Sequence, residues 1–138
     1  MKNIKPSELI RLAIKDLKTV ESMPDKYTVD MGEWHLKLQG TYHGTYMNRC
    51  YVCLAGSVMA ISLKATTQRF PGEFPEVENL LLALNKFRNG QIHMGLNQME
   101  VKLPAGIRDR NVCNYYVNKI RFKNDMLDMA DYLESFNL

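Results

Sequence analysis

Apolar residues recur three or four positions apart near the start of the chain. They are Leu9, Ile10, Leu12, Ala13, Ile14, Leu17 and Val20. Arg11, Lys15 and Lys18 fall on the opposite side of the same helical wheel, so this stretch predicts a surface helix with one buried face. Ser7 is placed to cap the start of that helix, and Pro24 marks its end.

Between Tyr27 and Asn48 the spacing of apolar residues changes from helical to alternating. Trp34, Leu36 and Leu38 alternate with polar residues, and glycines interrupt the Thr- and Tyr-rich stretch that follows. Alternation followed by glycine is typical of a strand that ends in a turn. This segment therefore predicts a short hairpin or an ordered loop.

The run from Cys50 to Leu63 is apolar in almost every direction of a helical wheel. A helix that is apolar all round belongs in a core or a membrane, and this one is too short to span a bilayer. Gly56 and Ala60 form a small-residue step that would let another backbone approach closely. We therefore expect a buried central helix at this position. Its side chains expected to be buried are Cys53, Leu54, Val58 and Met59.

Further helices are predicted at Glu76–Arg88 and at about Asp125–Phe136, with a short helix near 91–99 and a loop over 101–111. Together these elements predict a mainly α fold. We expect one compact helical domain over residues 1–138, with roughly four to six helices around the central helix and room for one short β-hairpin before it.

Composition narrows the class of protein. The chain has 138 residues, 46% hydrophobic and 24% charged, which is typical of a globular domain. The net charge of +3 is too small to indicate a nucleic-acid partner by itself. We find neither a signal-peptide pattern nor the run of about 18 apolar residues that a membrane span needs. Three cysteines without an export signal favour free thiols and a cytoplasmic protein.

His35, His43, Cys50 and Cys53 are ligand types that bind zinc. Their spacing matches no zinc finger known to us, and a cysteine in an apolar helix commonly serves as a small hydrophobe. The same Cys-x-x-Cys pair could be a redox pair, or Cys50 could be a nucleophile with a histidine as its base. We expect no cofactor, with zinc as the alternative.

Basic residues gather between positions 102 and 123, where only Asp109 opposes them. The basic residues are Lys102, Arg108, Arg110, Lys119, Arg121 and Lys123, and Tyr115 and Tyr116 lie among them. Such a segment could bind a phosphate backbone or an acidic protein surface. The acidic final helix could instead neutralise it within the fold, and we favour that interpretation.

Aromatic residues and histidines also gather between Trp34 and Tyr46. Trp34 is expected to anchor this segment to the core. Tyr42 and His43 flank the glycine-containing tip, and if exposed they would form a contact surface for a partner.

Two motifs carry a resemblance to a known group of proteins. They are Tyr27-x-Val29-Asp30-Met31-Gly32-x-Trp34-His35 and Cys50-x-Val52-Cys53-Leu54-Ala55-Gly56-x-Val58-Met59-Ala60. With them, about half of the chain resembles a family of small uncharacterised proteins encoded by bacteriophages and prophages. The resemblance implies an origin and a place of action, the cytoplasm of an infected bacterium. It implies no chemistry and no functional residues.

The sequence therefore favours a non-enzymatic protein that binds and modulates a host or phage protein. The contact would be made by the basic segment or by the Trp34–Tyr46 segment. The alternatives are nucleic-acid binding through residues 102–123 and a metal or catalytic site at Cys50. A homo-oligomer is compatible with the sequence, and a membrane partner is not expected.

Overall fold

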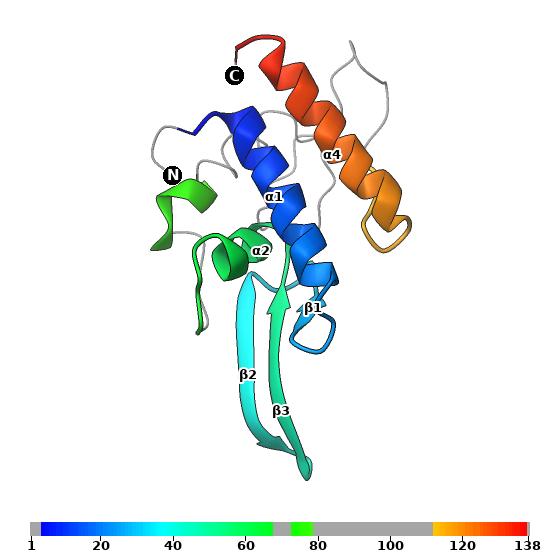
Figure 1. The fold of residues 1–138 in the computed structure, drawn as a ribbon. Helices are drawn as coiled ribbons and strands as arrows, with labels where there is room; N and C mark the ends of the chain where they lie inside the picture. The colour runs from blue at the N-terminus through cyan, green and yellow to red at the C-terminus, as the bar shows by residue number, and fades with distance from the viewer. Residues whose placement is uncertain (1–3, 68–72, 79–111, 138) are drawn as a thin grey trace.

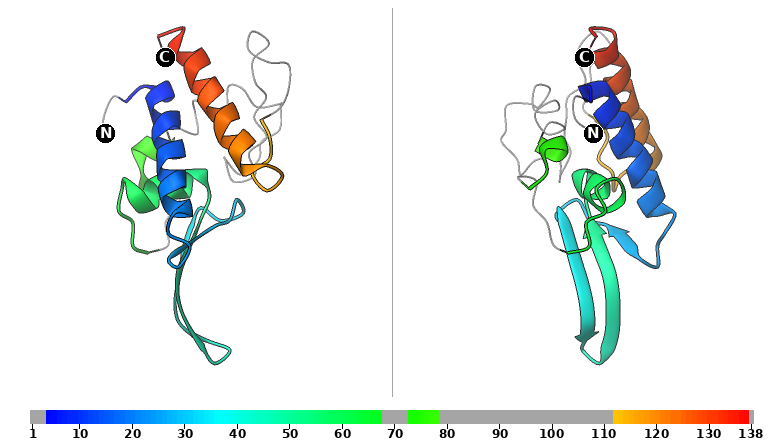
Figure 2. Two further views of the ribbon diagram at one scale, coloured as in Figure 1. Left: turned by 45° about the vertical axis from the view of Figure 1, so that its right-hand side comes forward. Right: turned by 60° about the vertical axis from the view of Figure 1, so that its left-hand side comes forward.

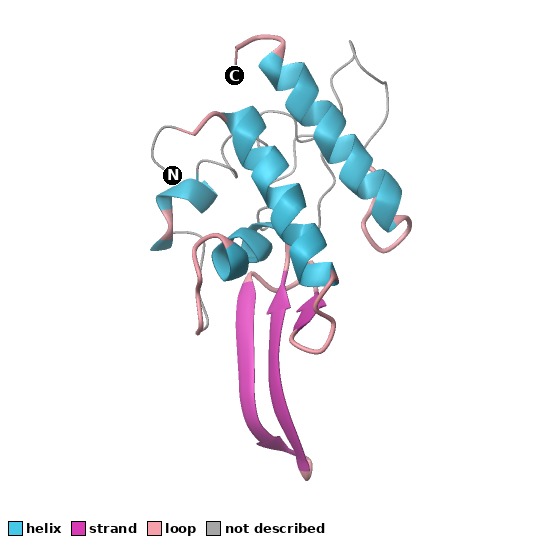
Figure 3. Cartoon of the chain, in the orientation of Figure 1, coloured by secondary structure: helices cyan, strands magenta, loops and turns pink. Residues whose placement is uncertain are grey.

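The computed structural model describes residues 4–67, 73–78 and 112–137. Within them, helices pack together above a three-stranded sheet (Figures 1 and 3). The elements are α1 (Pro6–Glu21), β1 (Tyr27–Val29), β2 (His35–Tyr42), β3 (Thr45–Val52), α2 (Leu54–Ile61) and α4 (Lys119–Glu134). Residues 75–78 are also helical.

The prediction of a mainly α fold is wrong, because the chain forms an α/β fold with a mixed sheet. The strand order is β1-β3-β2, with β1 parallel to β3 and β2 antiparallel to it. The expected hairpin exists, but it is longer than predicted, and β1 joins it as a third strand. A run that is apolar in almost every position does not distinguish a buried strand from a buried helix, and this ambiguity hid the last three residues of β3.

The run Cys50–Leu63 is divided between a strand and a helix. Cys50 belongs to β3, and the helix α2 begins at Leu54. Cys53, between them, caps α2 because its sulfur accepts a hydrogen bond from the Gly56 N–H at 3.3 Å. The four side chains that were predicted to be buried are confirmed as buried: Cys53, Leu54, Val58 and Met59.

The main core lies where α1 packs against α2 and α4. The helices α1 and α4 lie side by side and run in opposite directions (Figures 1 and 2). The predicted apolar face of α1 is confirmed, since Leu9, Ile10, Ile14 and Leu17 are almost fully buried. At the outer end of this helix pair, Arg11 donates to carboxylates of Asp131 and Glu134 at 2.8 and 2.6 Å.

Both helix starts differ from the prediction. Ser7 does not cap α1, because the helix begins at Pro6, two residues earlier than a cap at Ser7 would give; Ser7 is a buried residue of its first turn. The helix α4 begins at Lys119 and not at Asp125. Its cap is the Asn118 side chain, which accepts the Arg121 N–H at 2.9 Å. Three basic residues, Lys119, Arg121 and Lys123, hid the first turns of this helix from the sequence analysis, although an Asn at position 118 is a typical helix cap.

The predicted helix Glu76–Arg88 is described only over residues 76–78, which are helical. The expected helix near 91–99 and the expected loop over 101–111 lie outside the described residues. Among the described residues, no helix has the length and apolar character needed to cross a membrane.

Candidate functional site

The strands β2 and β3 continue well beyond the sheet as a two-stranded ribbon. We call residues 36–51 the hairpin arm. The strand β1 pairs with residues 50–52 of β3, so among the described residues the rest of the arm consists of β2 and β3 alone. Figures 1 and 3 show the arm extending away from the helices, with its tip at the far end of the molecule.

A two-residue turn closes the arm at its tip. His43 and Gly44 have φ values of 50° and 80°, and Tyr42 pairs with Thr45 across the turn. Positive φ at both central residues is the type I′ geometry, whose twist matches that of the flanking strands. Tyr42 and His43 are both exposed, and their role in binding stays a prediction.

The two faces of the arm differ in chemistry because neighbouring side chains in a strand point to opposite sides. The register places the apolar side chains on one face: Leu36, Leu38, Tyr42, Met47 and Tyr51. None of these five belongs to either hydrophobic core cluster of the described residues, or packs against one. We call this surface the apolar face of the arm. The arm therefore carries apolar side chains that the described core does not use.

One charged residue, Arg49, shares the apolar face, but its guanidinium turns toward the base of the sheet. It donates to the Pro24 carbonyl and the Thr28 hydroxyl, both at 2.7 Å. These bonds hold the turn that precedes β1 against β3. The apolar face of the arm is consequently left without a charge directed outward from it.

The opposite face of the arm is polar. Its residues toward the tip are Lys37, Gln39, Thr41, Tyr46 and Asn48. At the base of this face Cys50 is buried in a small cluster with Val20 and Tyr27. The contrast between the two faces gives a direct way to test which one binds a partner.

The predicted zinc ligands are not brought together. Cys50 and Cys53 are three positions apart in extended chain, so their side chains point to opposite sides and join different core clusters. His43 is at the tip of the arm. His35 alone is near Cys50, with its Nε2 atom 3.8 Å from the sulfur. The described residues contain no group of three His, Cys, Asp or Glu side chains arranged to hold a metal.

The thiols of Cys50 and Cys53 are poorly suited to nucleophilic chemistry. Burial raises the pKa of Cys50, although Lys37 and Lys26 oppose the shift. Burial also raises the pKa of Cys53 to about 12, against hydrogen bonds from the backbone. Since the thiolate is the reactive form, both cysteines are held in the unreactive thiol form near neutral pH.

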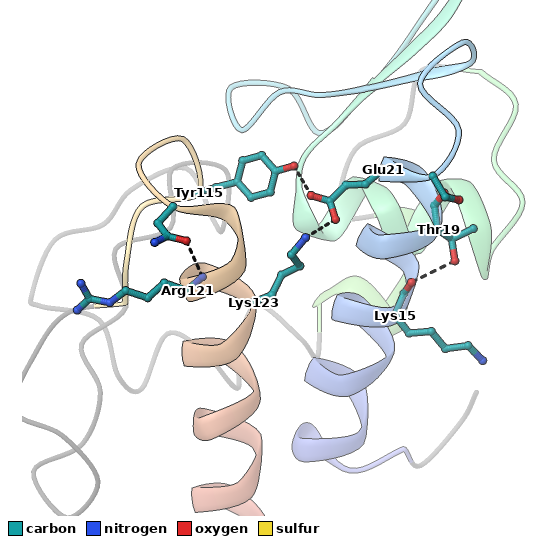
Figure 4. A network of polar contacts seen from close by, with 8 residues as sticks. Lys15, Thr19, Glu21, Tyr115, Arg121 and Lys123 are labelled. Carbon is teal, nitrogen blue, oxygen red and sulfur yellow. Dashed lines mark hydrogen bonds and ion pairs between the residues drawn. The ribbon is translucent and has the colours of Figure 1, made fainter.

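The described part of the predicted basic segment is largely tied into the fold (Figure 4). Tyr115 is buried and donates from its hydroxyl to Glu21 at 2.6 Å, and Lys123 forms an ion pair with the same carboxylate. The Nε atom of Arg121 lies 3.7 Å from the Oδ2 atom of the buried Asp125. Lys119 is exposed and has its ammonium 5.5 Å from the ring of Tyr115.

For Lys123 the neutralising acid is not in the final helix as we expected, although Arg121 does lie beside Asp125 of that helix. Lys123 pairs with Glu21 of α1, whereas the acids near the end of α4, Asp131 and Glu134, pair with Arg11. Tyr116 is exposed, and its hydroxyl accepts the Met31 N–H at 2.7 Å. Lys102, Arg108 and Arg110 lie outside the described residues. A binding role for this segment stays a prediction.

Sequence reasoning missed most of the apolar face of the arm. It found the alternation at Leu36 and Leu38 but assigned no strand to residues 45–49 and a helix to Tyr51. Two signals could have found the second strand. Met47 and Tyr51 occupy alternate positions, and the His43–Gly44 pair between two Thr- and Tyr-rich runs is a hairpin signal.

Comparisons with protein-family models, with curated proteins and with solved structures found no match to this chain. A functional assignment consequently depends on the geometry of the site itself.

Proposed function

We propose that this chain is a non-enzymatic protein that binds another protein through the apolar face of its hairpin arm. The observation that carries the proposal is that Leu36, Leu38, Tyr42, Met47 and Tyr51 share one face and pack against neither core cluster of the described residues. Tyr42 is exposed and the other four are half-buried, and apolar side chains that reach the surface side by side are characteristic of protein interaction sites. Tyrosine is also enriched at the centres of such interfaces.

The partner class follows from the resemblance to small phage proteins, which favours a host or phage protein. An arm that stands away from the body can enter a groove of a partner, which then contacts its apolar face. The burial of Cys50 and Cys53 supports a function without covalent chemistry at these thiols, since burial raises the pKa of both.

Nucleic-acid binding through the basic segment is the weaker alternative. Among the described residues of that segment, Lys123 is engaged by Glu21 and Tyr115 is buried. The hairpin arm contains no acidic residue, but only Lys37 and Arg49 are basic, and Arg49 is turned toward the sheet. Phosphate binding depends on several accessible cations acting together.

The test compares two double variants that differ in the face they alter. Leu38→Thr with Met47→Thr changes the apolar face, and Gln39→Thr with Asn48→Thr makes the matched change on the polar face. Threonine preserves strand propensity in both. Each form of the full chain is immobilised and exposed to bacterial lysate, and the retained proteins are quantified by mass spectrometry. Far-UV circular dichroism checks that both variants fold.

We expect the wild-type chain and the polar-face variant to retain one or more proteins in similar amounts. The apolar-face variant should retain at least about tenfold less of the same proteins. Direct titration with the purified partner then measures the affinity difference. Equal retention by both variants would show that the apolar face is not the contact surface. Retention of DNA or RNA at low salt, lost steeply as salt rises, would favour the alternative instead.

A further inference from the structure

The outer edge of β2 has backbone groups that are available for pairing. Within the described part of the chain, β2 is an edge strand, and the backbone of its residues 36–42 forms no hydrogen bond to other backbone outside the ladder with β3. The turn fixes which groups face outward. Tyr42 and Thr45 close a two-residue turn and form a hydrogen-bonded pair. From there along the ladder, non-hydrogen-bonded pairs alternate with hydrogen-bonded pairs. Lys37, Gln39 and Thr41 therefore direct their N–H and C=O groups away from β3.

The Cys50 amide supports this assignment. Cys50 pairs with Lys37 across the ladder, and its N–H donates to the Lys26 carbonyl on the other side, at 2.9 Å. It is thus directed away from β2, as the alternation requires.

A two-stranded ribbon is marginally stable by itself, and three or more strands are needed for independent stability. From residue 49 of β3 toward the tip, the arm has two strands and two open edges among the described residues. Natural edge strands are commonly protected by proline, by several charges or by very short length. The strand β2 has eight residues, no proline, and Lys37 as its one residue among Lys, Arg, Asp and Glu.

We propose that two copies of this chain pair through the outer edges of β2, antiparallel, to form a continuous four-stranded arm. A two-fold axis at Gln39 places Lys37 opposite Thr41 of the second copy, and Gln39 opposite its own counterpart. All outward-facing groups of residues 37–41 then find partners. A self-complementary contact of this kind is the usual way in which symmetric dimers form.

The side chains fit a second copy at this register. The apolar Leu36 lies opposite Tyr42 of the second copy, and an aromatic–aliphatic pair of this kind stabilises a sheet. Leu38 lies opposite Gly40, which has no side chain to obstruct it. No two like charges are placed directly opposite each other, because the single lysine of each strand faces a threonine. Charge therefore does not oppose the association.

The geometry of the arm also permits this assembly. Because the arm points away from the helices, antiparallel pairing places the two helical bodies at opposite ends of the new sheet (Figure 2). The two apolar faces fall on the same side of that sheet and become continuous. This inference goes beyond the proposed function, since it uses the edge of the arm and leaves the apolar face for a partner.

Proline at two facing positions tests the proposal. Gln39→Pro removes an outward N–H from the edge of β2, and Asn48→Pro removes one from the opposite edge, in the same cross-strand pair. Neither substitution removes a bond of the ladder between β2 and β3, so the two should affect folding alike. Sedimentation velocity of the full-length protein over a range of concentrations measures the association, and circular dichroism measures folding.

We expect the wild-type chain and Asn48→Pro to dimerise with similar affinity, and Gln39→Pro to be monomeric. A second variant, Gln39→Lys, places like charges at the two-fold axis on an exposed position, and it should weaken dimerisation at least about tenfold even if proline disturbs the strand. A monomeric wild-type chain at all concentrations would overturn the inference. Dimerisation of Gln39→Lys equal to wild type would also overturn it, and neither result bears on partner binding by the apolar face.

Discussion

The carbonyl oxygen of Trp34 lies 1.6 Å from the position that a Cβ atom on Gly56 would occupy. The segment that leads into β2 therefore crosses directly over the first turn of α2. The sequence predicted that Gly56 and Ala60 would let another backbone approach closely. At Gly56 this is confirmed, because the backbone of the loop before β2 lies against it, and the contact fixes the arm to the helical body.

Gly56→Ala should destabilise the protein by about 3 kcal/mol or more, because a backbone carbonyl cannot move aside as a flexible side chain can. Gly56→Leu should prevent folding. Chemical denaturation followed by circular dichroism measures the effect. Gly32→Ala is the control, since its new Cβ would meet only the side-chain oxygen of Asp30, at 3.2 Å. Equal stability of Gly56→Ala and wild type would mean that this contact is misplaced.

Asp16 should make stability depend on pH. It is buried on α1 and accepts a hydrogen bond from Ser62, and burial raises the pKa of its carboxyl above the ordinary value although that bond opposes the shift. A raised folded-state pKa favours the protonated acid in the native protein. Its contribution is therefore fully present at pH values below the unfolded pKa and is lost as pH rises through the folded pKa.

Asp16→Asn should remove this loss while keeping an acceptor for Ser62. Its melting temperature should exceed that of wild type more at about pH 7 than at about pH 3.5, which lies below the ordinary pKa of an aspartate. Asp25→Asn, at an exposed position, removes the same charge without the burial. If the two variants change with pH in the same way, burial of Asp16 is not the cause.

The ion pair between Glu21 and Lys123 should be energetically stronger than the pair between Arg11 and Asp131. The side chains of the first pair are 21% and 14% exposed, against 35% and 71% for the second. A double-mutant cycle with Glu21→Gln and Lys123→Met should give a coupling energy of about 1 kcal/mol, and the cycle at the exposed pair less than about 0.5 kcal/mol. Urea unfolding of all variants measures both, and a reversed order would contradict this account.

The three thiols should react at different rates. Cys50 and Cys53 are 3% and 0% exposed, whereas Cys113 is half-buried. Alkylation of the native protein should modify Cys113 first, and the other two only after unfolding. Peptide mass spectrometry at successive times identifies the order. Rapid modification of Cys50 in the folded protein would revive the hypothesis of a reactive site there.

Local patterns in the sequence identified α1, the buried residues of α2 and the existence of a hairpin. Each depends on spacing within a few positions, such as the recurrence of Leu9, Ala13 and Leu17 on one side of a helix. The tip of the arm was also readable, because His43 and Gly44 separate two runs that favour strands.

The rest depends on pairing between distant segments, which spacing does not encode. No local feature indicates that Tyr27 pairs in parallel with Cys50, so β1 and the mixed sheet were not predicted. The Cys50–Cys53 pair resembled a metal or redox motif until its extended backbone placed the two sulfurs on opposite sides. Likewise, the partners of Lys123 and Tyr115 could be identified only when α1 and α4 were placed together.

The parallel pairing of β1 with the last three residues of β3 makes the length of the arm independent of the body. Deleting two neighbouring cross-strand pairs, Gln39–Gly40 with Met47–Asn48, would leave every remaining side chain on its own face and the base register intact. The reach would shorten by about 7 Å. Deleting a single pair would instead reverse the faces of the tip. The length of the arm can thus change in steps of two residues per strand, because the side chains of a strand alternate with a period of two.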